Sequence, residues 1–316
     1  METVSTTPKT NPVEARTAAE IAMQPQFTAV QFYTLFDGLQ LIRELVALFR
    51  TVQRFRGASI AWAAGDNSFE RTNLELVDEL GRNRVMLELF RTTRHDLLSQ
   101  SEWRTLNTGL DTVVTQVAAG EHLANYEHKS ELLQLIIRLI QRVASSRNYF
   151  SGSFQSDRLN ECRKFASAES DRDLIRLVFL EVLQFTETIG RLRGLATYAA
   201  VIGDVDHRLA DQLEAIVVSV HQQLEQFRAH ASGFQHYALK GIPSLVERQV
   251  NETKLLELTR AIKIGIINHA EATLDGQALF QMATEVIDIH LQIVYQTIDY
   301  LNAKTQHRLH CWYHGG

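Results

Sequence analysis

The chain has 316 residues, of which 45% are hydrophobic and 22% are charged. These fractions are close to those of ordinary globular domains, so they exclude wholesale disorder, and the length allows one large or two ordinary domains. The net charge of −5 argues against a nucleic-acid surface that covers a whole domain, because such surfaces are basic. We therefore expect a globular protein that does not bind nucleic acid directly.

The cysteine content and the apolar segments indicate a cytoplasmic protein. Cys162 and Cys311 are far apart and fit no metal or redox spacing, so a disulfide framework is not expected. Residues 1–26 are polar and lack the apolar core of a secretory signal, and we expect them to form a disordered tail. The most apolar stretch, 132–143, contains polar residues and is too short to cross a membrane, so no membrane association is expected.

After the tail, helical periodicity dominates the sequence. Apolar residues recur three and four positions apart, as in Leu41, Leu45 and Leu48, and no proline occurs from 26 to 242. Alternation typical of strands is essentially missing. The pattern predicts eight helices, at about 27–64, 67–99, 101–119, 121–148, 171–202, 204–230, 244–270 and 277–304.

The predicted helices divide into two sets of four. Gly65-Asp66 and Gly203-Asp204 each supply a glycine that can end one helix and a carboxylate that can cap the next. We expect an all-α fold of two up-down four-helix bundles that form one module. Its segments are a first bundle at 27–150, a linker at 151–170, a second bundle at 171–305 and a C-terminal tail at 306–316.

A short motif occurs once in each half. The residues RFRGA at 54–58 correspond to RLRGL at 191–195, and both are followed by several alanines and a Gly-Asp pair. The tripeptide LIR precedes the motif in both halves, at 41–43 and 174–176. These correspondences indicate an internal repeat in which the first helix of each bundle carries an Arg-Gly pair near its end.

The Arg-Gly pairs are the candidate functional site. A glycine inside a helix costs about 1 kcal/mol relative to alanine, so Gly57 and Gly194 are expected where a neighbouring backbone or a small ligand approaches closely. Arg56 and Arg193 each present a planar guanidinium fork suited to a planar oxyanion. Whether the two arginines share one site or each serves its own bundle stays open. Tight helix packing without any ligand is the alternative explanation.

Helical spacing suggests further members of the site. Ser59 lies three residues after its arginine and Thr197 lies four residues after its own, so both hydroxyls are candidates for secondary contacts to an anion. Arg54 and Arg191, two residues before the candidate arginines, should be solvated.

The motif also resembles a known family. Arg-Phe-Arg-Gly-Ala-Ser at 54–59, after Leu-Ile-Arg-Glu-Leu at 41–45, is similar to the arginine-glycine signature of nitrate- and nitrite-sensing domains. The resemblance covers roughly 30–305. It implies two four-helix bundles and an anion, nitrate or nitrite, bound by one arginine from each bundle, here Arg56 and Arg193. Phe55 and Leu192 stand where such motifs are expected to have an acidic or polar residue.

Members of this family are usually fused to an output module, such as an RNA-binding antiterminator domain, a kinase or a chemotaxis signalling region. Only the segment 305–316 follows the last predicted helix, so we expect a sensor that signals in trans to a separate protein. The apolar last helix is a candidate surface for that partner or for a homodimer, although bundle core is the simpler explanation of its pattern.

Other chemistry finds little support in the sequence. The histidines and the cysteine at 307–314 are potential zinc ligands without a fixed partner site, and His269 and Glu271 are isolated. No nucleophile elbow, phosphate-binding loop or kinase signature is present. We expect no enzyme activity, no cofactor and no metal site. A ligand-free helical scaffold is the second hypothesis for the function, and a bundle metalloenzyme is the third.

Overall fold

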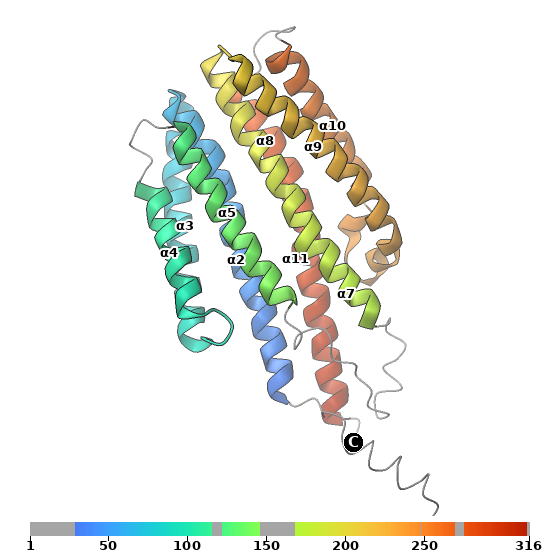
Figure 1. Ribbon diagram of the computed structural model, residues 1–316. Coiled ribbons are helices and arrows are strands. Elements are labelled where there is room, and N and C mark those ends of the chain that lie inside the picture. The colour runs from blue at the N-terminus through green and yellow to red at the C-terminus, as the bar shows by residue number, and fades with distance from the viewer. Residues whose placement is uncertain (1–28, 116–121, 146–167, 247, 269–274, 315–316) are drawn as a thin grey trace, which may run out of the picture.

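The computed structural model describes residues 29–115, 122–145, 168–246, 248–268 and 275–314. Its elements are helical throughout this part of the chain, which confirms the predicted all-α fold (Figure 1). The first half consists of α2 (Ala29–Ala63), the 3-10 turn η1 (Asn67–Phe69), α3 (Glu70–Thr93), α4 (Gln100–Thr115) and α5 (His122–Ser145).

The second half begins with one continuous helical run. It consists of α7 (Ala168–Arg176), the π-helical turn η4 (Leu177–Val182) and α8 (Leu183–Ile202). The other elements are α9 (His207–Ala231), the 3-10 segments η5 (Ser232–Lys240) and η6 (Pro243–Leu245), α10 (Arg248–Ile262), the π-turn η7 (Lys263–Ile267) and α11 (Gly276–His314). The polar tail predicted at 1–26 and most of the linker predicted at 151–170 lie outside the described residues.

The helix ends follow the predicted glycine chemistry with one change. Gly65 and Gly203 have φ angles of 107° and 69°, in the left-handed region that favours glycine. Asp66 accepts a hydrogen bond from the backbone amide two residues later, as a capping side chain should. At α9, however, the capping carboxylate is Asp206 and not the predicted Asp204.

The last helix is longer than the sequence pattern predicts. α11 continues to His314, so the described part of the segment predicted as a separate tail, 306–314, is helical. The ring of Trp312 lies 6.2 Å from the ring of Phe32 at the start of α2. This aromatic contact between the two helix ends gives the last turns of α11 a tertiary partner.

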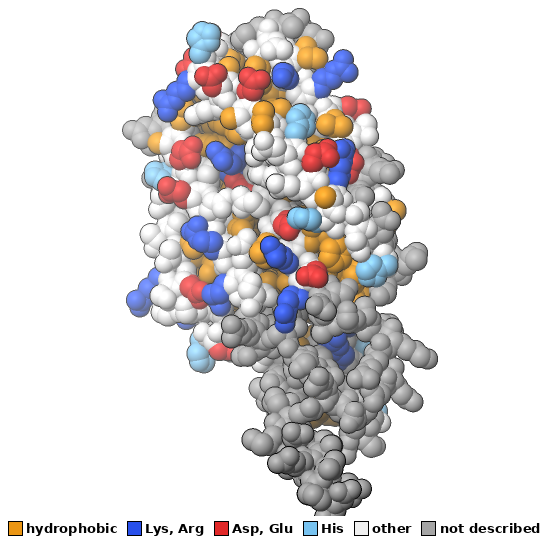
Figure 2. Space-filling view, turned by 45° about the vertical axis from the view of Figure 1, so that its right-hand side comes forward, with side chains coloured by type: hydrophobic (Ala, Val, Ile, Leu, Met, Phe, Trp, Pro, Cys, Tyr) orange, Lys and Arg blue, Asp and Glu red, His pale blue; other side chains and the backbone are white. Residues whose placement is uncertain are grey.

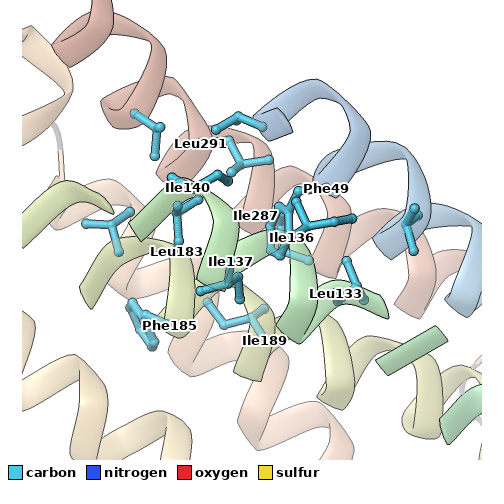
Figure 3. Packing of buried hydrophobic residues seen from close by; sticks show 14 of the residues in the cluster. Phe49, Leu133, Ile136, Ile137, Ile140, Leu183, Phe185, Ile189, Ile287 and Leu291 are labelled. Carbon is cyan, nitrogen blue, oxygen red and sulfur yellow. The ribbon is translucent and has the colours of Figure 1, made fainter. Parts of the chain in front are cut away.

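Four helices form the centre of the molecule. α2 packs against α5, α8 and α11, while α3, α4, α9 and α10 lie further out (Figure 1). The buried side chains form one cluster that runs through both halves. Figure 3 shows part of this cluster, where Phe49 of α2, Ile136 of α5, Ile189 of α8 and Ile287 of α11 pack together. The two bundles therefore share one continuous apolar core.

The outer surface carries mixed charges. On the face shown in Figure 2, acidic and basic side chains are interspersed among polar and apolar ones. Among the described helices, none combines the length and apolar character that a membrane span requires.

Candidate anion-binding site

The two candidate arginines are buried between α2 and α8. Arg56 is 0% exposed and Arg193 is 1% exposed, which is unusual for a side chain that is always charged in water. On each helix the polar and glycine positions recur at spacings of three and four, so they lie on one stripe that faces the other helix. The stripe residues are Gln53, Arg56 and Gly57 on α2, and Glu187, Gly190, Arg193 and Gly194 on α8.

The glycines allow this close approach. A Cβ atom added to Gly194 would lie 2.8 Å from Cε2 of Tyr126 and 3.8 Å from Cα of Gly57. A Cβ atom added to Gly57 would lie 3.0 Å from Cε2 of Phe280 and 3.3 Å from Nε of Arg193. The space beside both glycines is therefore filled by protein atoms, as expected for close backbone approach.

Arg56 has charged and polar partners for both of its terminal nitrogens, whereas its Nε has no hydrogen-bond partner among the described residues. Its Nη1 donates to Oγ of Ser130 at 2.9 Å and to Oε1 of Glu187 at 2.6 Å, and its Nη2 donates to Oε2 of Glu187 at 3.2 Å. The guanidinium carbon lies 5.1 Å from the centre of the Tyr126 ring. Burial opposes the charged form, but the carboxylate of Glu187 outweighs burial and raises the pKa of Arg56.

Arg193 has only neutral partners. Its Nη1 donates to Oγ1 of Thr284 at 2.9 Å, its Nη2 donates to the backbone oxygen of Gln53 at 2.6 Å, and its guanidinium carbon lies 4.8 Å from the centre of the Phe280 ring. Burial, followed by the positive charges of Arg56 and Arg54, lowers the pKa of Arg193 to about 9. Within the described residues, no carboxylate forms an ion pair with this guanidinium.

The surroundings of the two arginines are duplicated. The last helix of each bundle supplies an aromatic ring and, four residues later, a hydroxyl: Tyr126 and Ser130 from α5, Phe280 and Thr284 from α11. Each ring stacks on the arginine of its own bundle and also covers the glycine of the other bundle. The structure therefore brings both Arg-Gly pairs into one pseudo-symmetric cluster at the junction of the bundles.

A third cation lies in the same region. Lys129 of α5 is 2% exposed, and its Nζ donates to the backbone oxygen of Asn125 at 3.4 Å. The amine also lies 5.2 Å from the centre of the Phe55 ring. Burial and then the charge of Arg56 lower the pKa of Lys129 to about 8.

Neither of the predicted hydroxyls forms a hydrogen bond with a guanidinium group of the cluster. Ser59 donates its Oγ proton to the backbone oxygen of Arg56 at 3.3 Å, and Thr197 is buried with no hydrogen-bond partner for Oγ1 among the described residues. The hydroxyls that contact the guanidiniums are instead those of Ser130 and Thr284.

The arginines that were expected to be solvated differ from each other. Arg191 is exposed, as predicted. Arg54 is half-buried, and its Nε has no hydrogen-bond partner among the described residues. The prediction for Arg54 is therefore wrong, because this side chain lies close enough to Arg193 to affect its charge.

Seven residues of the cluster were not predicted as site residues from the sequence: Gln53, Tyr126, Lys129, Ser130, Glu187, Phe280 and Thr284. One signal for Glu187 was present, because a lone acid interrupts an otherwise apolar and hydroxylated run in α8. The residues on α5 and α11 gave no comparable signal, since Tyr-Ser and Phe-Thr pairs four residues apart are ordinary in helices.

The part of the chain that the structure describes holds no group of three or more potential metal ligands. In the C-terminal turns of α11, Sγ of Cys311 lies 3.7 Å from Nε2 of His307. His269 and Glu271 lie outside the described residues.

The similarity of this chain to known proteins concerns its fold. No protein-family model matches the chain, and no curated protein matches it. Among solved structures, the chain is similar to the NasR transcription antiterminator, with a TM-score of 0.63 over 93% of this chain and 74% of that one. Sequence identity is 15%, so the similarity shows a shared helical architecture.

Proposed function

We propose that this protein is a regulatory sensor that binds nitrate or nitrite between its two bundles and passes the signal to a separate output protein. Arg56 and Arg193 are the primary anion contacts in this proposal, and Gly57 and Gly194 keep the two arginines close together. The resemblance of the motif at 54–59 to nitrate- and nitrite-sensing domains suggests the anion, and the fold shared with a transcription antiterminator supports a regulatory role.

The observation that carries the proposal is an excess of buried positive charge. Arg56, Lys129 and Arg193 are at most 2% exposed, and Glu187 is the buried carboxylate that pairs with one of them. A buried charge without a counter-charge is costly, and neutral acceptors offset only part of that cost. An anion bound beside Arg193 would supply the missing charge, so the folded protein should favour its binding.

The geometry favours a small planar anion. A guanidinium offers coplanar N–H donors, which match two oxygens held at a fixed angle, as in nitrate and nitrite. The helices approach so closely at the glycines that a large ligand would have to push them apart. Because both arginines are buried, entry of even a small anion requires local movement of α2 against α8, and this couples binding to a conformational change.

Titration calorimetry with nitrate, nitrite, sulfate and chloride tests the proposal. We expect saturable heat with nitrate or nitrite, and affinity lower by about tenfold to a hundredfold in Arg193→Met, because hydrogen bonds to a charged group are lost. Methionine keeps the apolar stem and the fold can be checked by circular dichroism. Arg191→Met is the matched control, since this arginine is exposed and two residues away, and its affinity should be unchanged.

Two results would overturn the anion-sensor function: no saturable binding of nitrate or nitrite to the wild-type protein, or equal affinity in Arg193→Met. The close helix packing at Gly57 and Gly194 favours a ligand-free scaffold as the second candidate. That alternative predicts no anion response in any variant, while alanine at either glycine still destabilises the protein.

A further inference from the structure

The two halves of the duplicated site differ at the position six residues before each arginine. Glu187 lies six residues before Arg193 on α8, and the equivalent position before Arg56 on α2 is residue 50. Residue 50 is an arginine, and its Nε and Nη2 donate to the carboxylate of Asp288 at 2.8 and 2.9 Å in a partly exposed pair. The acid at 187 is therefore a feature of the second half alone.

The carboxylate of Glu187 is seated where an external anion would be expected. It is 1% exposed, and both of its oxygens accept hydrogen bonds from the Arg56 guanidinium, at 2.6 and 3.2 Å. A carboxylate is a planar group with two oxygens on one atom, so this contact has the form that nitrite or nitrate would make with the same arginine. The side chain of Glu187 thus presents a carboxylate to one of the two candidate arginines.

Gln53 of α2 helps to position the carboxylate of Glu187. The side-chain nitrogen of Gln53 lies 3.5 Å from Oε2 of Glu187 and donates to the backbone oxygen of Thr186 at 2.8 Å. The same residue accepts the hydrogen bond from Arg193 through its backbone oxygen. Gln53 therefore links the two arginines, because it contacts the carboxylate that pairs with Arg56 and accepts a hydrogen bond from Arg193.

We propose that Glu187 is an internal competitor for the sensed anion, an inference that rests on the proposed function. The external oxyanion binds Arg193 and replaces the carboxylate of Glu187 on Arg56, so that the anion bridges the two helices. Exchange of one planar oxyanion for another keeps the charge of Arg56 balanced throughout. Lys129 is a further buried cation of the cluster.

This exchange has consequences for affinity and selectivity. An anion must displace a two-oxygen contact that is already formed, so Glu187 lowers the affinity and sets a concentration threshold. Chloride offers no pair of coplanar oxygens and cannot reproduce the contact that it would have to replace. Glu187 therefore acts as a specificity-determining residue as well as a competitor.

The decisive variant is Glu187→Gln, which keeps the size and one acceptor oxygen but removes the charge. We expect calorimetry to show affinity for nitrate or nitrite higher by about tenfold or more, and a smaller preference over chloride. Asp299→Asn is the matched control, because it removes an exposed ion pair between Arg43 of α2 and Asp299 of α11 away from the cluster. Its affinity should equal that of the wild type.

A second variant tests the proposal independently if Glu187→Gln folds poorly. Glu187→Ala leaves Arg56 without its carboxylate, and formate has the same planar anionic group. We expect formate to raise the thermal stability of Glu187→Ala more than that of the wild type, and nitrate to compete with formate for this variant.

The outcomes separate the two proposals. Binding to the wild type with unchanged or weaker affinity in Glu187→Gln overturns the competitor role and leaves the sensor function standing. Binding in Glu187→Gln but none in the wild type overturns the sensor function, and with it the role of Glu187 as a competitor for a sensed anion. No binding in either protein, and no formate effect in Glu187→Ala, overturns both.

Discussion

At the scale of single residues, the amine of Lys129 is a buried charge that the fold holds at a cost in stability. Lysine is rarely this buried without a carboxylate partner, and here the amine has a backbone oxygen and the ring of Phe55 as its neighbours. Such contacts recover only part of the hydration that the amine loses. The charge of Lys129 therefore costs stability.

The pKa of Lys129 makes this cost measurable. In the folded protein it is lowered to about 8 from the ordinary value of 10.5, so between these values the unfolded chain binds more protons. This group therefore makes the folded state more stable as pH rises from about 8 to 10.5. Near neutral pH, Lys129→Met should raise the free energy of unfolding by about 1–3 kcal/mol.

Urea unfolding of wild type and Lys129→Met at a series of pH values checks this prediction. The advantage of the variant should shrink as pH rises above about 8. Lys254→Met is the control, because Lys254 is an exposed amine paired with Glu285, and its effect should show no such trend. A Lys129→Met protein less stable than the wild type near neutral pH would contradict the prediction.

At the scale of elements, the close crossing of α2 and α8 depends on glycines and not on helix propensity: Gly190 lies against the side chain of Gln53, and Gly57 and Gly194 lie beside the arginines. The sequence predicts the helices themselves well, because apolar periodicity and helix-ending glycines act locally. The sequence does not show that the ring of Tyr126 fills the space beside Gly194, or that the ring of Phe280 fills the space beside Gly57. Both rings come from helices far away in the chain. The sequence predicts that a neighbouring group approaches Gly57 and Gly194 closely, but it does not show which residues supply that group.

A pair of alanine substitutions separates packing from propensity. Gly194→Ala should lower the free energy of unfolding by about 1–3 kcal/mol, because the new Cβ atom would lie 2.8 Å from the ring of Tyr126. Gly81→Ala, on the exposed side of α3 with no atom within 4 Å of the new Cβ, should raise it by about 0.5–1 kcal/mol. Denaturant titrations measure both, and equal effects at the two positions would refute the packing argument.

At the scale of the whole molecule, the shared core predicts that the two bundles unfold together. α2 contacts α8 and α11 of the other half, and the buried cluster is continuous between them. A loss of packing in the outer helix of one bundle should therefore weaken the other bundle as well.

Leu213→Ala provides the test, because Leu213 is 0% exposed in α9 and its truncation should cost about 2–5 kcal/mol. Trp103 in α4, on the far side of the first bundle, serves as the probe in a background where Trp62 and Trp312 are phenylalanine. We expect its fluorescence midpoint in urea to shift as much as the circular dichroism midpoint. An unshifted Trp103 transition would show that the bundles unfold independently.

The sequence by itself determined the features that depend on local chemistry. Helices follow from periodicity and from the lack of proline between 26 and 242, and the Arg-Gly candidates follow from a motif that occurs twice. Only the tertiary structure decided that both arginines meet at one junction, that Arg56 pairs with Glu187, and that Arg193 has neutral partners. Charge balance in a buried site depends on which distant side chains reach it, and spacing along the chain carries no information about that.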